Sequence, residues 1–145
     1  GRPPWGADAE ISGLDLGQRY YRKALFQKLD PMPPDYLTRR LGRVRGTGRE
    51  EKFQILLAHS PMYFKDYRAW GADLTLSGHF HGGTIRIPGL GGVMTPQYQF
   101  FLPWCAGDFE RDGKRMIVSR GLGTHSINIR LNNRPQLVLI RLRRA

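Results

Sequence analysis

Cysteine, long apolar runs and acidic side chains are scarce in this chain, and the first two scarcities each exclude a class of protein. The 145 residues contain one cysteine, Cys105, so neither an intrachain disulfide nor a multi-cysteine zinc site can form. No apolar run approaches the roughly 20 residues of a transmembrane helix. The opening residues, GRPPWGADAE, have no starting methionine and none of the apolar core of a signal peptide. An upstream segment and the cell compartment therefore stay open.

The few acidic residues leave the chain strongly basic. Twelve Asp and Glu stand against 23 Lys and Arg, of which 18 are Arg, so the formal net charge is +11. A charge of this size attracts anions such as nucleic acids, acidic lipids and phosphorylated small molecules, and it does not choose among them. Hydrophobic residues make up 40% of the chain, which is enough for the buried core of one domain.

Turn residues divide the chain into short segments that are typical of an α/β protein. The run FQILLA at 53–58 is continuously apolar, as in a strand buried on both faces. Ser60 and Pro61 then predict the start of a helix that ends at Gly71, and DLTLS at 73–77 predicts the next strand. The remaining expected strands are 8–14, 84–87, 115–119, 126–131 and 136–142, and the remaining expected helices are 16–29 and 34–41.

Histidines directly follow two of these expected strands. His59 comes after FQILLA, and His79 and His81 lie in GHFHGG after DLTLS. Ligand sites in α/β sheets gather at the carboxyl ends of strands, so these side chains are expected to share one site. In an extended segment His79 and His81 would point the same way, with Phe80 turned toward the core. Imidazole binds transition metals, so a metal site is one interpretation; for the remaining histidine, His125, an ordinary structural role is expected.

Other candidate residues have ordinary structural interpretations. Arg86 and Arg120 could contact a substrate phosphate, although arginines beside strands are usually solvated. Trp70 and Trp104 fit core or lid packing better than base stacking. Nothing near Cys105 in the sequence offers a paired base, so this thiol is interpreted as structural.

Four segments resemble the C-terminal half of the calcineurin-like metallophosphoesterases. AHSP at 58–61 and WGADLTLSGHFHGG at 70–83 are similar to that family, and VSRGLG at 118–123 and NRPQLVLIRL at 133–142 resemble one bacterial branch of it. The resemblance covers roughly residues 8–142. It implies an α/β (α+β mixed) fold that is part of a four-layer α/β/β/α sandwich.

The resemblance also implies a chemistry and a set of ligands. His59 and His79 would bind one metal ion and His81 the other, in a centre of two divalent ions drawn from Mn, Fe, Zn or Ni. Such a centre clamps a phosphoryl group and activates a bound water as hydroxide, which cleaves a phosphomonoester or phosphodiester. The implied substrate is a phosphorylated small molecule.

The N-terminal motifs of that family are absent from this chain. Asp-x-His, Gly-Asp-x-x-Asp and Gly-Asn-His-Glu or Gly-Asn-His-Asp do not occur. GDFERD at 107–112 imitates the second motif with one residue too many, and we interpret it as a turn. Residues 1–145 are therefore expected to be the C-terminal half of a domain. The N-terminal half would lie upstream in the same polypeptide or in a second chain, and this chain alone would be inactive.

Three alternatives stay open at this point. The chain could be a degenerate relative without activity, or a mononuclear metal hydrolase built from His59, His79 and His81 alone. It could also be a basic nucleic-acid-binding module, although no nucleic-acid motif is present and the aromatic residues are not interleaved with the basic stretches. A membrane anchor upstream of residue 1 is compatible with all of these.

Overall fold

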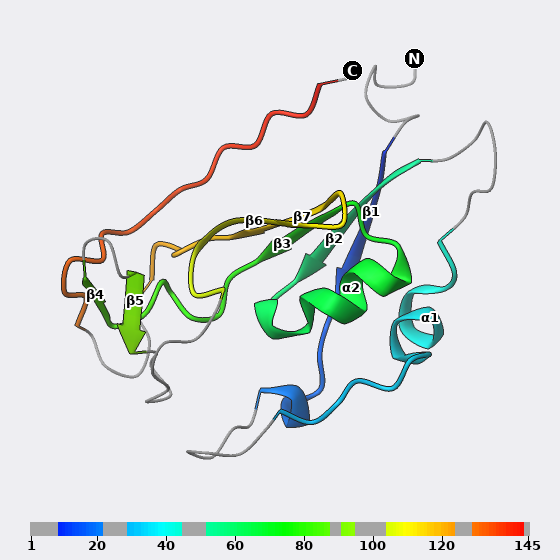
Figure 1. Cartoon of the computed structure of the whole chain (residues 1–145), viewed down its shortest axis with the longest axis horizontal. Helices are drawn as coiled ribbons and strands as arrows, with labels where there is room; N and C mark the ends of the chain where they lie inside the picture. Colours follow the sequence, from blue (N-terminus) through cyan, green and yellow to red (C-terminus); the bar gives the residue numbers. More distant parts are fainter. Residues whose placement is uncertain are drawn as a thin grey trace.

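The computed structural model describes residues 9–21, 29–44, 52–87, 91–94, 104–123 and 129–143 (Figure 1). The strands are β1 (Ala9–Leu14), β2 (Phe53–Ala58), β3 (Leu74–Ser77), β4 (Ile85–Ile87), β5 (Gly91–Met94), β6 (Gly107–Arg111) and β7 (Lys114–Val118). The helices are α1 (Tyr36–Leu41) and α2 (Phe64–Trp70), with 3₁₀ turns η1 (Gln18–Tyr20) and η2 (Pro61–Tyr63). In the described part of the chain, no helix has the length and hydrophobicity that a membrane crossing requires.

Five of the strands form one sheet in the order β1-β2-β3-β7-β6. The pairs β1–β2, β2–β3 and β3–β7 are parallel, and β6–β7 is antiparallel. Strands β4 and β5 form a separate antiparallel pair, seen at the left of Figure 1. The expected mixed α/β fold is confirmed, because the sheet is mostly parallel and flanked by helices.

The unit from β2 to β3 forms where local signals agree. The side chain of Ser60 accepts a hydrogen bond from the backbone N–H of Met62 (3.4 Å), and Pro61 occupies the first position of η2. Helix α2 follows and ends at Gly71, whose φ of 119° only glycine adopts easily. A Cβ at Gly71 would also stand 2.9 Å from Val44, so close packing requires glycine there as well.

Helices α1 and α2 pack on one face of the sheet. The register pairs Leu14 with Ala58, and both side chains point to this face. They join a cluster of buried tyrosines, leucines and small residues that forms the main core: Leu14, Leu16, Tyr20, Met32, Tyr36, Leu37, Leu56, Ala58, Tyr63, Tyr67 and Ala72. A smaller cluster contains Phe64, Met116 and Val118, with Trp104 and Phe109 packed against it.

Two sequence-based expectations for the sheet are wrong. GDFERD at 107–112 is not a turn, because residues 107–111 form β6. The actual turn is Asp112-Gly113, where both residues have positive φ (53° and 70°), the geometry that suits a tight hairpin. FQILLA at 53–58 is not buried on both faces either, because Phe53 and Leu57 are 42% and 45% exposed.

The ends of the chain also differ from expectation. Residues 136–142 form no strand, although they alternate between exposed and partly buried side chains as a strand would. Leu137 and Leu139 are 85% and 87% exposed. Of the expected helix 16–29, the described residues contain only η1. Half of the expected strand 126–131 lies outside the described residues, as does His125, and residues 129–131 form only an isolated bridge between Leu131 and Ile85.

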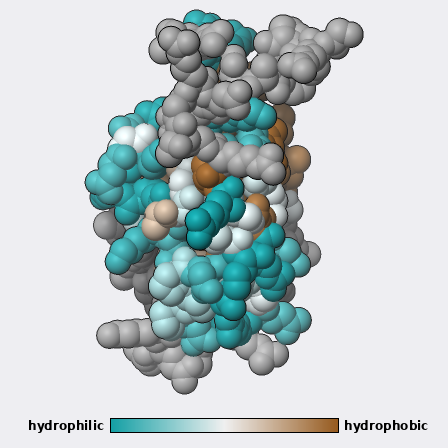
Figure 2. Space-filling view, turned by 90° about the vertical axis from the view of Figure 1, so that its right-hand side faces the viewer, coloured by the Kyte–Doolittle hydropathy of each residue, from teal (hydrophilic) through white to brown (hydrophobic). Residues whose placement is uncertain are grey.

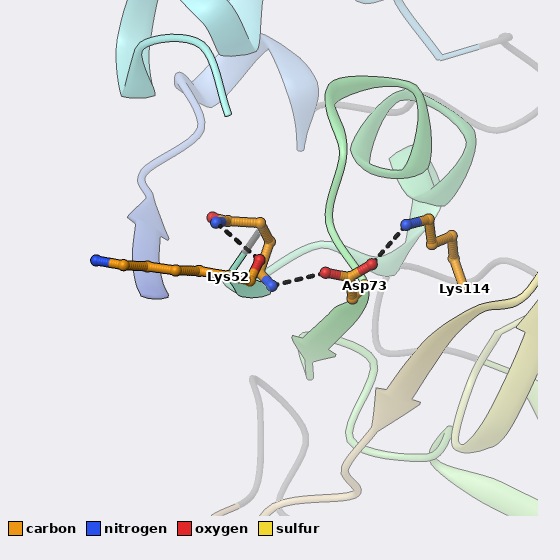
Figure 3. Close-up of polar contacts among 4 residues, drawn as sticks. Lys52, Asp73 and Lys114 are labelled. Carbon is orange, nitrogen blue, oxygen red and sulfur yellow. Dashed lines mark hydrogen bonds and ion pairs between the residues drawn. The ribbon is translucent and has the colours of Figure 1, made fainter. Parts of the chain in front are cut away.

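Asp73 ties three strands together at the end of the sheet opposite the histidines (Figure 3). Its carboxylate accepts hydrogen bonds from the backbone N–H of Gln54 (2.7 Å) and from Lys114 Nζ (2.5 Å). Its backbone N–H donates to the carbonyl of Gln54, and its own carbonyl accepts from Arg115 (both 2.9 Å). The Gln54 side chain in turn donates to the carbonyl of Lys52 (3.2 Å). One residue therefore sets the start of β2, β3 and β7.

Candidate metal centre

The carboxyl ends of β2 and β3 bring two histidines together. These strands are parallel neighbours, so His59 after β2 and His79 after β3 emerge at the same edge of the sheet. The backbone N–H of Gly78 donates to the carbonyl of His59 (3.1 Å) and fixes the two segments side by side. The imidazole rings stand 5.0 Å apart, centre to centre, at an interplanar angle of 72°.

Tyr21 completes a small group of rings with this pair. Its ring centre lies 5.8 Å from that of His59 and 5.0 Å from that of His79. Burial, followed by the charge of Asp15, raises the pKa of Tyr21, so the phenol stays neutral at pH 7. Sequence reasoning missed this residue, because Tyr21 lies far from both histidines in the sequence and belongs to none of the motifs considered.

His59 carries the neutral imidazole that a metal requires. The side chain lies near the surface, but the neighbouring protein removes part of its hydration. This desolvation lowers the pKa of His59 below the ordinary value, because the charged imidazolium loses more hydration free energy than the neutral ring when water is excluded. At neutral pH the ring is therefore unprotonated and offers a nitrogen lone pair as a ligand.

The backbone of the GHFHGG segment is a turn, and the expected extended geometry is wrong. His79 and His81 have φ of 70° and 49°, in the left-handed region that non-glycine residues rarely adopt. Phe80 is 3% exposed, so its expected orientation toward the interior is confirmed. Its carbonyl accepts from the backbone N–H of Gly83 (2.7 Å), which closes the turn. Strain of this kind persists only where the surrounding structure holds it, and it is typical of functional sites.

Asn133 holds this turn from the C-terminal part of the chain. Its side-chain Nδ2 donates to the carbonyls of His81 (2.6 Å) and Gly83 (2.5 Å), and the residue is 2% exposed. His81 faces the segment after β7, where a Cβ at Gly121 would lie 3.6 Å from His81 Nδ1. Sequence reasoning missed Asn133, because its partner lies 52 residues away.

The three candidate ligands therefore form a pair and a separate third residue. The structure brings His59 and His79 together, and it orients His81 toward another segment. Among the described residues, no three His, Cys, Asp or Glu side chains form a group that could hold a metal ion. The roles of His59, His79 and His81 as metal ligands stay a prediction.

Several curated proteins are similar in sequence to this chain. It is 32% identical over 91 residues to the uncharacterized metallophosphoesterase YkuE of Bacillus subtilis, a match that covers 63% of this chain and 31% of YkuE. It is 30% identical over 105 residues to the uncharacterized metallophosphoesterase YkoQ of the same species (71% and 38%). It is 32% identical over 89 residues to the phosphodiesterase YaeI of Escherichia coli (61% and 32%).

The chain is homologous to the metallophosphoesterases. No family model and no solved structure matches it. The chain spans about a third of the length of the curated relatives that it matches. All of these relatives are bacterial, and the family consists of phosphoester hydrolases that use divalent metal ions.

The residues present suit such ions. Imidazole nitrogens are good ligands for divalent transition metals, and neutral rings leave a metal's positive charge intact for a phosphate. Cys105 is expected to have a structural role instead. It is 7% exposed, and burial raises the pKa of its thiol, as expected of a structural cysteine.

Proposed function

We propose that this chain is the C-terminal half of a two-metal phosphoesterase domain that hydrolyses a phosphomonoester or phosphodiester. The observation that carries the proposal is the pair of His59 and His79, whose rings lie 5.0 Å apart at the carboxyl ends of β2 and β3 in a homologue of the metallophosphoesterases. The missing N-terminal half would supply the bridging carboxylate and the remaining ligands, because this chain lacks the motifs that contain them.

The division into a pair and a single histidine supports the assignment of ligands. His59 and His79 would hold one ion, and His81, held by Asn133 on the other side of the turn, would hold the second. Two divalent ions supply charge neutralisation of a phosphoryl group and an acidified water. The task of this chain's residues is to present neutral nitrogens at fixed positions, which the strained turn and the lowered pKa of His59 favour.

An uncovered sheet face supports the need for a second half. On the side of the sheet away from α1 and α2, Ile11, Phe53 and Leu57 are 62%, 42% and 45% exposed; we call them the open sheet face. The register places Ile11 beside Ile55 and Leu57 beside Leu76, so apolar side chains line this face across three strands, although Ile55 itself is only 7% exposed. Figure 2 shows hydrophobic surface among mostly hydrophilic residues on one side of the molecule.

We infer that the N-terminal half covers this face. The curated relatives are about three times as long as the matched part, so their remaining residues provide enough chain for a second layer. Sheets bury their apolar faces by packing against another layer, and a sandwich does so with a second sheet. The half could be joined to residue 1 or belong to a separate polypeptide.

The mononuclear alternative receives less support from the geometry. A three-histidine zinc site requires all three nitrogens about 2 Å from one ion, and no such group of three exists among the residues that the structure describes. The distinction is measurable, because this alternative predicts metal-dependent turnover by the 145-residue chain alone.

The deciding experiment is an activity assay with and without the N-terminal half. The chain alone should not hydrolyse bis-p-nitrophenyl phosphate, and the reconstituted complex with Mn²⁺ should. In the complex, His79→Ala should reduce kcat at least about 100-fold, because a metal ligand is lost. His125→Ala is the matched control and should change kcat by less than about threefold. Turnover by the chain alone that His59→Ala abolishes would favour the mononuclear enzyme, and an inactive complex would favour a degenerate relative.

A further inference from the structure

Two arginines converge on one glycine next to the candidate metal centre. Arg86 Nη1 donates to the carbonyl of Gly82 (3.0 Å). The side chain of Arg120 lies against the same residue, because its Cγ is 2.5 Å from the position a Cβ at Gly82 would occupy. Gln136 orients Arg120, because the side-chain Oε1 of Gln136 accepts hydrogen bonds from the backbone N–H (3.3 Å) and the Nε (3.2 Å) of Arg120. Both residues are partly exposed, so a ligand can approach them.

A third arginine, Arg130, binds the backbone of the segment that contains Arg120. Arg130 Nη2 donates to the carbonyls of Arg120 (3.1 Å) and Gly121 (3.4 Å), and to that of Gly123. It therefore fixes the segment that contains Arg120 and adds a third positive charge. Its Nε and Nη1 are buried without an acceptor in the structure.

Among the described residues, no carboxylate forms an ion pair with these three arginines. The sequence contains no Asp or Glu from residue 74 to residue 107, and none after residue 112. The ion pairs among the described residues involve other basic side chains: Arg39, Arg68, Lys114 and Arg115. Arg86 and Arg120 both lie against Gly82, and a bound anion would supply the negative partner that their positive charges lack among the described residues. The planar fork of arginine matches phosphate oxygens in particular.

We propose that Arg86 and Arg120, arranged around Gly82, bind a phosphate group beside the candidate metal centre. Gly82 directly follows His81, so this group would lie beside the phosphate that is cleaved, and we assign it to a second phosphate of the substrate. The preferred substrates would then be small molecules with two phosphate groups. The identification of the anion as part of a substrate rests on the proposed function, whereas phosphate binding itself requires no metal.

The test is calorimetric titration of the 145-residue chain with inorganic phosphate and with pyrophosphate, in a chelator and at low salt. We expect saturable binding, with Kd raised about tenfold by Arg86→Gln or Arg120→Gln, since each removes a charged hydrogen-bond donor. Arg143→Gln is the matched control. It loses the same charge on the exposed C-terminal segment and should change Kd less than twofold.

Arg86→Lys and Arg120→Lys distinguish a loss of binding from a loss of folding. They keep the charge and the fold, as circular dichroism would verify, but they lack the planar fork and should still weaken binding. A parallel titration with glycerol 3-phosphate separates a substrate phosphate from free phosphate, because only a substrate site should bind the ester at least as tightly. Absent saturation, or equal weakening by Arg143→Gln, would overturn the proposal. Because no metal is present, these results are independent of whether the reconstituted complex is active.

Discussion

His79 and His81 each adopt a left-handed backbone conformation, which costs free energy unless other contacts in the fold offset it. A left-handed φ disfavours a residue with a Cβ by roughly 1–2 kcal/mol, and here two such residues stand on either side of Phe80. The hydrogen bonds from Asn133 to the carbonyls of His81 and Gly83 are contacts that offset this cost. Stability and site geometry therefore depend on the same side chain.

We expect Asn133→Ala to destabilise the chain by about 1–3 kcal/mol, because a buried and a partly buried carbonyl lose their donor. Urea unfolding followed by circular dichroism measures this change. Arg134→Ala, at the exposed neighbouring position, should change the free energy of unfolding by less than about 0.5 kcal/mol. An Asn133→Ala variant as stable as the parent would show that the turn does not depend on this residue.

Cys105 allows a prediction about pH. Burial raises the pKa of its thiol above the ordinary value, so the unfolded state ionises first as pH rises. The contribution of this group to stability is complete below the unfolded pKa of about 8.5 and is lost as pH increases through the folded pKa. Reaction with iodoacetamide at pH 8 should accordingly be slow in the folded chain and fast in urea. Equal rates in both states would contradict the burial of the thiol.

At the scale of elements, Asp73 is the residue whose loss should matter most for the order of the strands. Asp73→Ala removes the acceptor for Gln54 and the partner of Lys114, and we expect a loss of about 1–3 kcal/mol (Figure 3). Asp73→Asn retains one acceptor and should lose about half as much. Thermal unfolding of both variants measures the difference. The prediction fails if Asp35→Ala, which breaks an exposed helical ion pair, costs as much.

Elements with strong local signals could be predicted from the sequence, and those that depend on distant contacts could not. Strand β2 and helix α2 follow from an apolar run, a serine cap and a terminal glycine, all within 20 residues. Strand β6 was missed because its pairing depends on the turn at Asp112 and Gly113, which a resemblance to a metal motif obscured. In the site, the strand ends placed His59 and His79 correctly. The left-handed turn and the hydrogen bonds from Asn133 depend on tertiary contacts, so they leave no local pattern in the sequence.

At the scale of the whole molecule, exposed leucines near the sheet predict association. Residues 136–141 run past β6 and β7, with a cavity of about 400 Å³ between them, and Leu137 and Leu139 point mostly into solvent. We expect Leu137→Ser combined with Leu139→Ser to reduce binding of the dye ANS and self-association of the chain. The free energy of unfolding should change by less than about 0.5 kcal/mol, because both side chains are exposed already.

Ile87→Ser is the control for this double variant. Ile87 is 46% exposed on the small β4–β5 sheet, away from the C-terminal segment, and its loss should leave association unchanged. Sedimentation velocity measures association in each variant. An identical reduction by Ile87→Ser would indicate general hydrophobicity and not a specific surface.

The order of the strands has a consequence for synthesis on the ribosome. Strand β3 lies at the centre of the sheet, but its second neighbour, β7, begins 37 residues after β3 ends, from Ser77 to Lys114. At about 5–20 residues per second, the ribosome needs about 2–7 seconds to make that stretch. During this interval one edge of β3 has no strand beside it. The nascent chain therefore passes through a period in which a chaperone, or a neighbouring nascent chain, competes with β7 for the same backbone groups.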